Sequence, residues 1–437
     1  MKCNEYILKF ADDHLPDMIE CRRDLHRYPE PGWTEFRTAA NVAKTLAALG
    51  YEVKTGEETI KEEAMMGVPS QEKLEREQKR AIAEGADPYW VEKMTGGKTG
   101  VLGVMHFSDD GPVVGVRFDM DSNDVTETAD PAHFPNQEGF ASCHPGAMHA
   151  CGHDGHTTVG LFLAKLLAQL KGELRGTIKL CFQPAEEGVR GAHAMVESGI
   201  VDDVDYMLGA HFGFKMKETG SIACNVTDFL ATTKYDVHFT GVPAHAGAAP
   251  EQGKNALLAS CTAAINLHAI ARHSAGASRI NVGRLDAGSG RNIIADRALL
   301  QMETRGATSE INRYMETESA RVIKGAAMMY DVKADIEKTG GAAGGSNSPK
   351  LALFLEEEAK ELGIFDKVVG ECPFGASEDF SYFMERVQSH GGEAAYMMVG
   401  ADLAAGHHDS HFSFDEKALA YSLKMMGASV VKLLTTK

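Results

Sequence analysis

Five side chains of the types that bind metals or act as nucleophiles lie within eight residues, in the stretch "HACGHDGH" (149–156). Cys151 and His153 flank a glycine, and in an extended segment residues two apart point the same way, so both can reach one cation. A thiolate with an imidazole suits zinc or another borderline metal. Two other interpretations stay open: a structural zinc knuckle between Cys143 and His156, or a nucleophilic Cys151 with a histidine as its base.

A pair of adjacent glutamates follows an apolar run in "TIKLCFQPAEEG". Neighbouring side chains leave an extended backbone on opposite sides, so we expect Glu186 and Glu187 to act differently. One can ligate a metal while the other takes a proton from an activated water. Most acidic pairs are solvated surface charge. The position of this pair directly behind a strand favours the catalytic interpretation.

Histidines supply the remaining candidate ligands. His211 ends the apolar run "DYMLGAH", and His407, His408 and His411 lie together in "GHHDSHF". At least one of these three is expected to be a ligand, and their spacing does not say which. Because so large a set exceeds what one tetrahedral zinc takes, we expect two cations roughly 3.5–4 Å apart that share a carboxylate.

A second set of polar residues lies farther along the chain. His245 stands in the Gly/Ala/Pro-rich stretch "GVPAHAGAAP", Asn292 in "GSGRNIIAD", and Arg305 in "METRG" at the end of a predicted strand. Each alone is more often structural than functional. Together they offer an imidazole, an amide and a guanidinium, which can polarise a carbonyl and bind a carboxylate.

The elements around the first set indicate an α/β fold. Apolar runs of strand length cover 113–118, 177–182 and 205–211. Between the first two we expect a helix that carries Leu163, Leu166, Leu167 and Leu170 on one face and ends at Gly172. Alternating strands and helices predict a mostly parallel sheet, whose carboxyl ends gather ligands. The residues at these ends are Asp119, Asp121, Glu186, Glu187 and His211.

The pattern changes from about residue 229. Strand, helix, two strands, helix and strand follow in order, which is the ferredoxin-like β-α-β-β-α-β unit. We therefore predict a catalytic domain formed by residues 1–228 and 340–437, interrupted by a lid or dimerisation domain at 229–339. A charged segment at 61–92 is expected to be a mostly solvated helical insertion with Ser70 as its N-cap.

Composition excludes several classes of partner. The 437 residues carry a formal net charge of −18, from 44 basic and 62 acidic side chains, which disfavours nucleic acid and anionic membranes. An anionic substrate therefore needs a local cation. The eight scattered cysteines favour reduced thiols and a cytoplasmic location, and neither a signal peptide nor a membrane span is apparent.

At these residues the sequence resembles the dinuclear aminoacylase/carboxypeptidase metallopeptidases, over essentially the whole chain. The resemblance is closest to the branch of hippurate and indole-acetyl-amino-acid hydrolases. The motifs that carry it are "MHACGHDGH", "FQPAEEG", "AHAG" with the following "P..G.NA", "SEDFS" and the terminal "HH…F.FDE".

The resemblance implies a role for each matched residue. It assigns Glu186 as the general base and His245 as a lid histidine that reaches a partner subunit's site. It assigns Asn292 and Arg305 to binding of the substrate carboxylate. In the family the last histidine ligand lies four residues before a phenylalanine, so Phe412 selects His408 over His407. The implied metal ligands are Cys151, His153, Glu187, His211 and His408.

The implied reaction is hydrolysis of the amide between an acyl or aroyl group and an amino acid, with two divalent cations, Mn²⁺ or Zn²⁺, per chain. The substrate that we expect is p-aminobenzoyl-glutamate, cleaved by a homodimer or a hetero-oligomer with a related subunit. Two departures concern specificity: Ser410 replaces a common proline, and "RFDMDSN" replaces "RADMDAL".

Alternatives remain open. The chain can hydrolyse another N-acyl amino acid or a dipeptide, or need a second, different chain for activity. It can also be a metal-stabilised scaffold without turnover, in which case Glu186→Gln would change nothing measurable.

Overall fold

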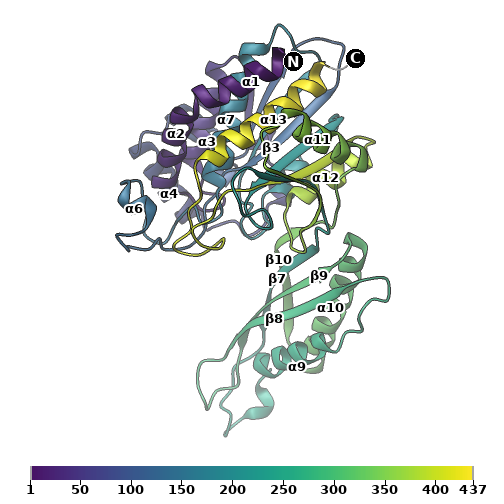
Figure 1. Ribbon diagram of the computed structural model, residues 1–437. Coiled ribbons are helices and arrows are strands. Elements are labelled where there is room, and N and C mark those ends of the chain that lie inside the picture. Colours follow the sequence, from purple (N-terminus) through teal and green to yellow (C-terminus); the bar gives the residue numbers. More distant parts are fainter. Residues whose placement is uncertain (1, 436–437) are drawn as a thin grey trace. The chain divides into compact units, whose positions relative to one another are not determined.

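The computed structural model describes residues 2–435, which form two compact units (Figure 1). The first unit contains 2–227, 346–374 and 379–435, and the second contains 228–345 and 375–378. The domain boundary expected at 339/340 falls inside a strand that continues to Ala342. Among the described residues, no helix combines the length and apolarity that crossing a membrane requires.

The first unit contains most of the helices. They are α1 (Lys2–Asp13), α2 (Leu15–Arg27), α3 (Phe36–Ala48), α4 (Gln71–Ala83), α5 (Pro88–Glu92), α6 (Phe134–Gln137), α7 (His153–Leu170), α8 (Ala192–Val196), α11 (Pro349–Leu362), α12 (Phe380–Ser389) and α13 (Lys417–Thr435), with the 3₁₀ turns η1 (Gly56–Glu58), η2 (Glu62–Ala64) and η3 (Thr95–Gly97).

Across the described residues, one eight-stranded sheet forms the centre of this unit. Its strands are β1 (Glu52–Thr55), β2 (Val101–His106), β3 (Val113–Asp119), β4 (Thr177–Gln183), β5 (Tyr206–Phe212), β6 (Ser221–Thr227), β11 (Lys367–Pro373) and β12 (Glu393–Val399). Their spatial order is β1-β2-β4-β3-β5-β12-β6-β11. The central neighbours β4, β3, β5 and β12 are all parallel, which confirms the predicted mostly parallel sheet.

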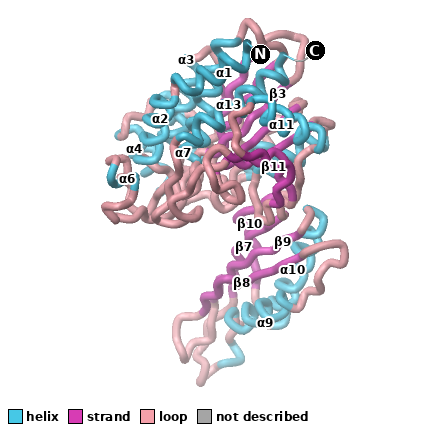
Figure 2. The backbone as a smooth tube through the Cα atoms, in the orientation of Figure 1, coloured by secondary structure: helices cyan, strands magenta, loops and turns pink. Residues whose placement is uncertain are grey.

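Helices cover both faces of this sheet (Figure 2). Along β3, Phe118 packs toward Gly160 of α7, while its neighbour Arg117 reaches Asp379 beside α12. Because successive strand residues point to opposite faces, α7 and α12 lie on opposite sides of the sheet. The helices α1 and α13, from the two ends of the chain, pack against each other on the α7 side.

The close approach of α7 to the sheet depends on a glycine. A Cβ at Gly160 would lie 2.7 Å from Phe118 Cδ2 and 2.7 Å from Phe182 Cε1, closer than real Cβ contacts. Both phenylalanines are buried in the core. Gly160 therefore sets the distance between the sheet and the helix that begins with His153.

We expect Gly160→Ala to lower the free energy of unfolding by about 1–2 kcal/mol, because the overpacking cost exceeds the gain in helix propensity. Thermal unfolding of the two proteins measures this difference. Gly172→Ala is the matched control, since a Cβ at Gly172 meets nothing within 4 Å. Equal losses in both variants would contradict the packing argument.

The charged insertion begins as its sequence predicts. The Ser70 hydroxyl accepts a hydrogen bond from the Lys73 N–H and caps α4, and Gly85 follows the helix with φ +92°. The insertion is mostly solvated, as expected, and Leu74 and Ala81 anchor it in the core of the first unit. A charged sequence with a narrow apolar stripe can thus pack on one side.

The second unit has the predicted β-α-β-β-α-β order. Its elements are β7 (Ala231–Thr240), η4 (Pro250–Gln252), α9 (Ala256–His268), β8 (Ser278–Ala287), β9 (Arg297–Gly306), α10 (Ser309–Met329) and β10 (Lys333–Ala342). The four strands form an antiparallel sheet in the order β10-β7-β9-β8. Both helices pack on this sheet over a core that includes Val237, Leu300 and Met315.

Candidate active site

The carboxyl ends of three neighbouring parallel strands carry the polar residues that the sequence singled out. Asp119 ends β3 and Asp121 follows two residues later; Glu186 and Glu187 follow β4; His211 lies next to the end of β5. Since β4, β3 and β5 are adjacent and parallel, these ends meet at one edge of the sheet.

A tight turn brings Cys151 and His153 to the same place. Gly152 has φ +89°, a left-handed conformation that favours glycine, and His153 is already the first residue of α7. The expectation that this segment is extended is therefore wrong. The two side chains converge because the chain reverses at Gly152 and enters a helix.

The two glutamates also lie in a turn and not on extended backbone, so that expectation is wrong as well. Ala185 precedes them with φ 50°. The Glu186 N–H donates to Asp121 Oδ1 at 3.0 Å, and the Glu187 N–H donates to Asp121 Oδ2 at 2.9 Å. One buried carboxylate thus fixes the backbone of both glutamates.

His153 is held in the orientation of a metal ligand. Its Nδ1 lies 2.9 Å from the Asp121 carbonyl oxygen, which can only accept, so Nδ1 carries a proton. Its Nε2 is buried and has no hydrogen-bond partner among the described residues. A buried ring nitrogen that lacks such a partner, and that lies 3.9 Å from Glu186 Oε2, fits a metal ligand.

His211 is also oriented as a metal ligand, with Nδ1 hydrogen-bonded to the backbone and Nε2 facing the cluster. Its Nδ1 donates to the Phe212 carbonyl at 2.8 Å, which leaves Nε2 facing Cys151 Sγ at 3.4 Å. Burial, together with the neighbouring histidines His156 and His407, lowers the pKa of His211 well below its ordinary value. The neutral imidazole is the form that binds metal.

The structure separates the three C-terminal histidines. His407 donates its Nε2–H to the Phe212 carbonyl at 3.0 Å and stacks on Phe214. His411 is exposed and pairs with Asp409. His408 has φ 66°, and its Nε2 lies 3.2 Å from Glu187 Oε1. Its backbone N–H also donates to the Ala150 carbonyl at 2.8 Å, which joins its loop to the segment before Cys151.

These side chains form overlapping groups whose ligand atoms lie within 4.8 Å of one another. Cys151 is grouped with His153 and His211, and again with Glu187 and His408. Glu186 and Glu187 form a further group with His153. A thiolate, two carboxylates and three imidazoles fit divalent cations of borderline softness. Cys151, His153 and Glu187 each belong to two of these groups. Of the three, a thiolate or a carboxylate can bridge two cations, so Cys151 competes with Glu187 for the expected shared position.

The ionisation of the cluster agrees with metal binding and not with a thiol nucleophile. Burial and the negative charge of Glu187 raise the pKa of Cys151 well above its ordinary value. A neutral thiol is a poor nucleophile, whereas a bound cation holds it as a thiolate. Burial raises the pKa of Glu187, but the contact with His408 and the charge of His153 outweigh it and lower that pKa to about 2.

A supporting network under the cluster was not assigned from the sequence. The Asp119 carboxylate accepts from His156 Nδ1 at 2.6 Å and from Arg117 Nη1 at 2.6 Å. Arg117 also donates to Asp379 of the "SEDFS" motif at 2.9 Å. The signal was present, because Asp119 directly follows a strand and Asp379 lies in a motif. Their joint role depends on a contact between residues far apart in the sequence, which no local pattern reveals.

The second unit brings together two of its three candidate residues. Ala246 N–H donates to the Asn292 carbonyl at 3.0 Å, so His245 and Asn292 lie in adjoining loops. Asn292 precedes the start of β9, whereas Arg305 lies near its end and pairs with Glu303 at 2.9 Å. At about 3.3 Å per strand residue, the length of β9 separates them. Within one chain, Arg305 therefore lies apart from the pair formed by His245 and Asn292.

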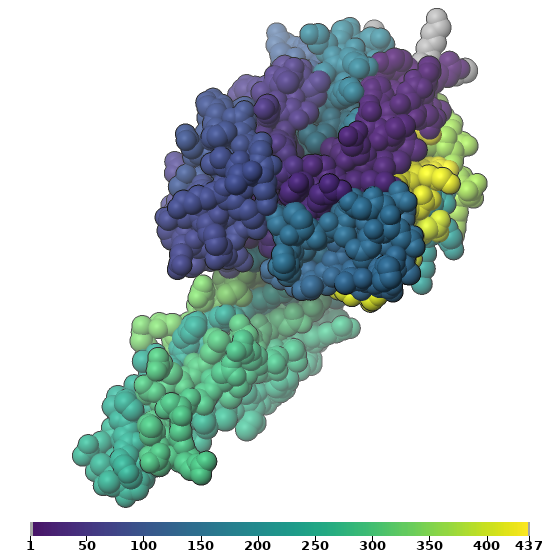
Figure 3. Space-filling view, turned by 90° about the vertical axis from the view of Figure 1, so that its left-hand side faces the viewer, coloured from purple at the N-terminus to yellow at the C-terminus, as the bar shows by residue number. Residues whose placement is uncertain are grey.

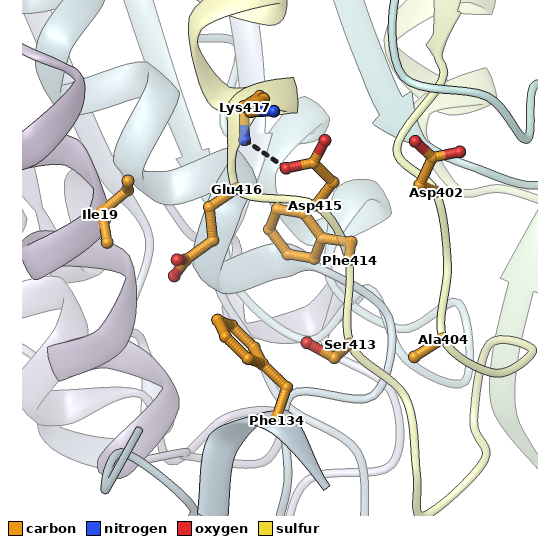
Figure 4. A pocket seen from close by; sticks show the side chains of 9 residues that line it. All are labelled: Ile19, Phe134, Asp402, Ala404, Ser413, Phe414, Asp415, Glu416 and Lys417. Atoms are coloured by element: carbon orange, nitrogen blue, oxygen red, sulfur yellow. Dashed lines mark hydrogen bonds between the residues drawn. The ribbon is translucent and has the colours of Figure 1, made fainter. Parts of the chain in front are cut away.

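The cavity shown in Figure 4 lies elsewhere in the first unit, at the start of α13. Its described lining residues include Phe134, Phe414 and Glu416 but no member of the ligand cluster. Glu416 pairs with Arg23 at 2.7 Å, and Asp415 accepts from the Lys417 N–H at 3.1 Å. This cavity therefore adjoins the base of the loop that carries His408 and is not the candidate active site.

Comparisons with known proteins show similarity over nearly the whole chain. The sequence profile of Peptidase family M20/M25/M40 matches residues 115–432. One chain of the p-aminobenzoyl-glutamate hydrolase of Escherichia coli (strain K12) is 46% identical over 435 residues, which are 99% of each chain. The indole-3-acetyl-aspartic acid hydrolase of Enterobacter agglomerans is 46% identical over 98% of this chain and 97% of that protein.

A solved structure is also similar over the full length. The aminobenzoyl-glutamate utilization protein from Klebsiella pneumoniae superimposes with a TM-score of 0.84 and 38% sequence identity. The similarity covers 99% of this chain and 98% of that chain.

Proposed function

We propose that this chain, which belongs to Peptidase family M20/M25/M40 and is a hydrolase of C–N bonds, cleaves p-aminobenzoyl-glutamate to p-aminobenzoate and glutamate. The family is the one that the motifs predicted. The relatives and the solved structure whose names include aminobenzoyl-glutamate support this substrate.

The observation that carries the proposal is the convergence of Cys151, His153, Glu187, His211 and His408 in overlapping groups of ligand atoms, with one further carboxylate beside them. We assign these five as ligands of two divalent cations, zinc or manganese. Bound cations supply Lewis acidity toward a carbonyl oxygen and make a water acidic enough to attack near neutral pH.

Glu186 is the further carboxylate, and we assign it as the general base. Its side chain is only 12% exposed, and its backbone is held by Asp121 in the same turn as Glu187. In this role it takes a proton from the attacking water as the C–O bond forms. It then returns that proton to the leaving amine nitrogen as the C–N bond breaks.

The second unit is proposed to bind and polarise the substrate. His245 Nδ1 accepts from the N–H groups of Gly247 and Ala248, so its proton is on Nε2, where it can donate to a developing oxyanion. Asn292 accompanies His245, and Arg305 is assigned to the substrate carboxylate. Because the length of β9 separates them, we propose that the first two act in a partner subunit's site, in a homodimer or a related hetero-oligomer.

The cytosol is the proposed compartment. All eight cysteines are free in the described part of the chain. A cytosolic protein keeps its thiols reduced, and a reduced Cys151 is required for metal binding.

The test is glutamate release from p-aminobenzoyl-glutamate by the purified chain with added Mn²⁺, beside hippurate and indole-3-acetyl-aspartate. The expected result is the highest kcat/KM on p-aminobenzoyl-glutamate, lost on chelation and restored by Mn²⁺ or Zn²⁺. Activity that survives chelation but not thiol alkylation would support a Cys151 nucleophile instead. A higher kcat/KM on another acyl amino acid would refute the substrate, and no turnover on any would refute the catalytic claim for this chain alone.

A further inference from the structure

A second cluster of ligand-type side chains lies apart from the residues assigned above. Glu84 stands at the end of α4, and Cys143 and His144 lie in the loop that leads toward Cys151. The ligand atoms of Glu84, Cys143 and His144 lie within 4.8 Å of one another. The charged insertion and the loop both reach the face of the first unit turned toward the viewer in Figure 3 (dark blue and steel blue).

The hydrogen bonds of His144 fix the role of each ring nitrogen. Nδ1 lies 2.8 Å from the Pro29 carbonyl oxygen, which can only accept, so Nδ1 carries a proton. Nε2 lies 2.7 Å from Glu84 Oε1. In a neutral ring this nitrogen would present a lone pair to a carboxylate. The contact therefore holds a proton between these two atoms, and a cation that binds both groups would displace that proton.

Both neighbours of His144 in this cluster, Glu84 and Cys143, have atoms that are available to bind a cation. Glu84 Oε2 is buried and accepts no hydrogen bond among the described residues, although Arg80 Nε lies 3.8 Å away. That guanidinium is in closer contact with Glu77. Cys143 is exposed, and its backbone is anchored by an N–H bond to the Arg27 carbonyl at 2.9 Å. The thiol is thus held in place and accessible to an ion from solution.

We propose that Glu84, Cys143 and His144 form an additional zinc site, which joins the charged insertion to the loop preceding the catalytic ligands. One thiolate, one imidazole and one carboxylate complete three positions of a tetrahedral site, and water completes the fourth. Their summed charge balances a divalent cation. The thiolate favours zinc over manganese, which prefers oxygen ligands, so the two kinds of site differ in selectivity.

The sequence interpretation of a single zinc knuckle between Cys143 and His156 changes accordingly. The structure divides that stretch: Cys143 and His144 join Glu84 of the insertion, while Cys151 and His153 join the catalytic cluster. The proposed site does not depend on the proposed reaction. Its metal content can be measured whatever the substrate is.

The experiment measures bound metal per chain by mass spectrometry after equilibrium dialysis against Zn²⁺ or Mn²⁺. The wild-type chain is expected to bind one more zinc ion than the Cys143→Ser variant does. The two proteins are expected to bind equal amounts of manganese. Glu84→Gln is expected to weaken the additional zinc at least tenfold, since it removes a charged ligand of the same size. Cys261→Ser, a cysteine in the second unit, is the control and should retain the wild-type zinc content.

A proton shared by His144 and Glu84 is the competing explanation. It predicts equal zinc content in wild type, Cys143→Ser and Glu84→Gln, and an imidazole NMR signal of His144 that zinc does not perturb. Either result would overturn the proposal. Zinc-dependent perturbation of that signal, absent in Cys143→Ser, would support it.

Discussion

Replacing Glu186 by glutamine is expected to lower kcat about 10²–10⁴-fold and to leave metal content unchanged. The substitution keeps the size and the backbone N–H that donates to Asp121, but it removes the carboxylate that accepts the proton. Steady-state kinetics on p-aminobenzoyl-glutamate, with metal analysis of the same samples, measures both quantities.

Glu187→Gln is the matched control, one residue away on the same turn. Glu187 Oε1 lies 3.2 Å from His408 Nε2, and Glu187 shares ligand groups with Cys151 and His153. This variant is expected to lose metal affinity, with activity partly restored by excess Mn²⁺. If Glu186→Gln instead lost metal, or recovered with excess Mn²⁺, the division of labour between the two glutamates would be refuted.

The second large effect is expected at Asp121. Its carboxylate accepts from the N–H groups of Glu186 and Glu187 and lies 3.3 Å from His153 Nδ1. In Asp121→Asn one oxygen becomes an amide nitrogen, which must then face a backbone N–H. We expect metal affinity to fall about 10–100-fold, because the groups that orient metal ligands have effects of this size.

Metal titration followed by activity, together with thermal unfolding, tests this prediction. Asp124→Asn is the control, an exposed aspartate three residues farther along the same loop. A wild-type metal affinity in Asp121→Asn would show that the turn around the glutamates keeps its shape without that carboxylate.

The fold could be predicted because its elements have strong local patterns. Strands such as β3 and β4 are short apolar runs, and the second unit alternates strands and helices in a recognisable order. The burial of Leu74 and Ala81 in the insertion was harder to predict, because charged residues surround these two apolar residues in the sequence. The end of β10 was also missed, because it lies in a glycine-rich stretch that resembles a loop.

The sequence indicates which residue types form the candidate site, but it does not indicate the backbone conformation that holds them. The expected extended segments at Cys151 and at Glu186 are turns, with Gly152 and Ala185 at positive φ. Left-handed backbone at a non-glycine residue such as Ala185 has no local sequence signal, because the surrounding structure imposes it. The resemblance, and not the spacing, distinguished His408 from His407.

The arrangement of the second unit could be foreseen only in part. His245, Asn292 and Arg305 form one set by their complementary chemistry. Arg305 lies near the end of β9, where the strand register places it opposite Thr232 and Arg279, whereas His245 and Asn292 lie in loops before that strand. Chemistry alone therefore suggests which residues suit a substrate but not how far apart the fold places them.

The strand order of the first unit has a consequence for how the chain matures during translation. β12 is inserted between β5 and β6, although it leaves the ribosome after the whole run of strands from β7 to β10. Until then, β5 and β6 present unpaired edges. His408 is translated later still, so a nascent chain cannot assemble the full ligand cluster before β12 has been made. The proposed catalytic metal site would thus be completed only after synthesis has passed β12, whereas Glu84, Cys143 and His144 of the proposed additional zinc site are all made well before it.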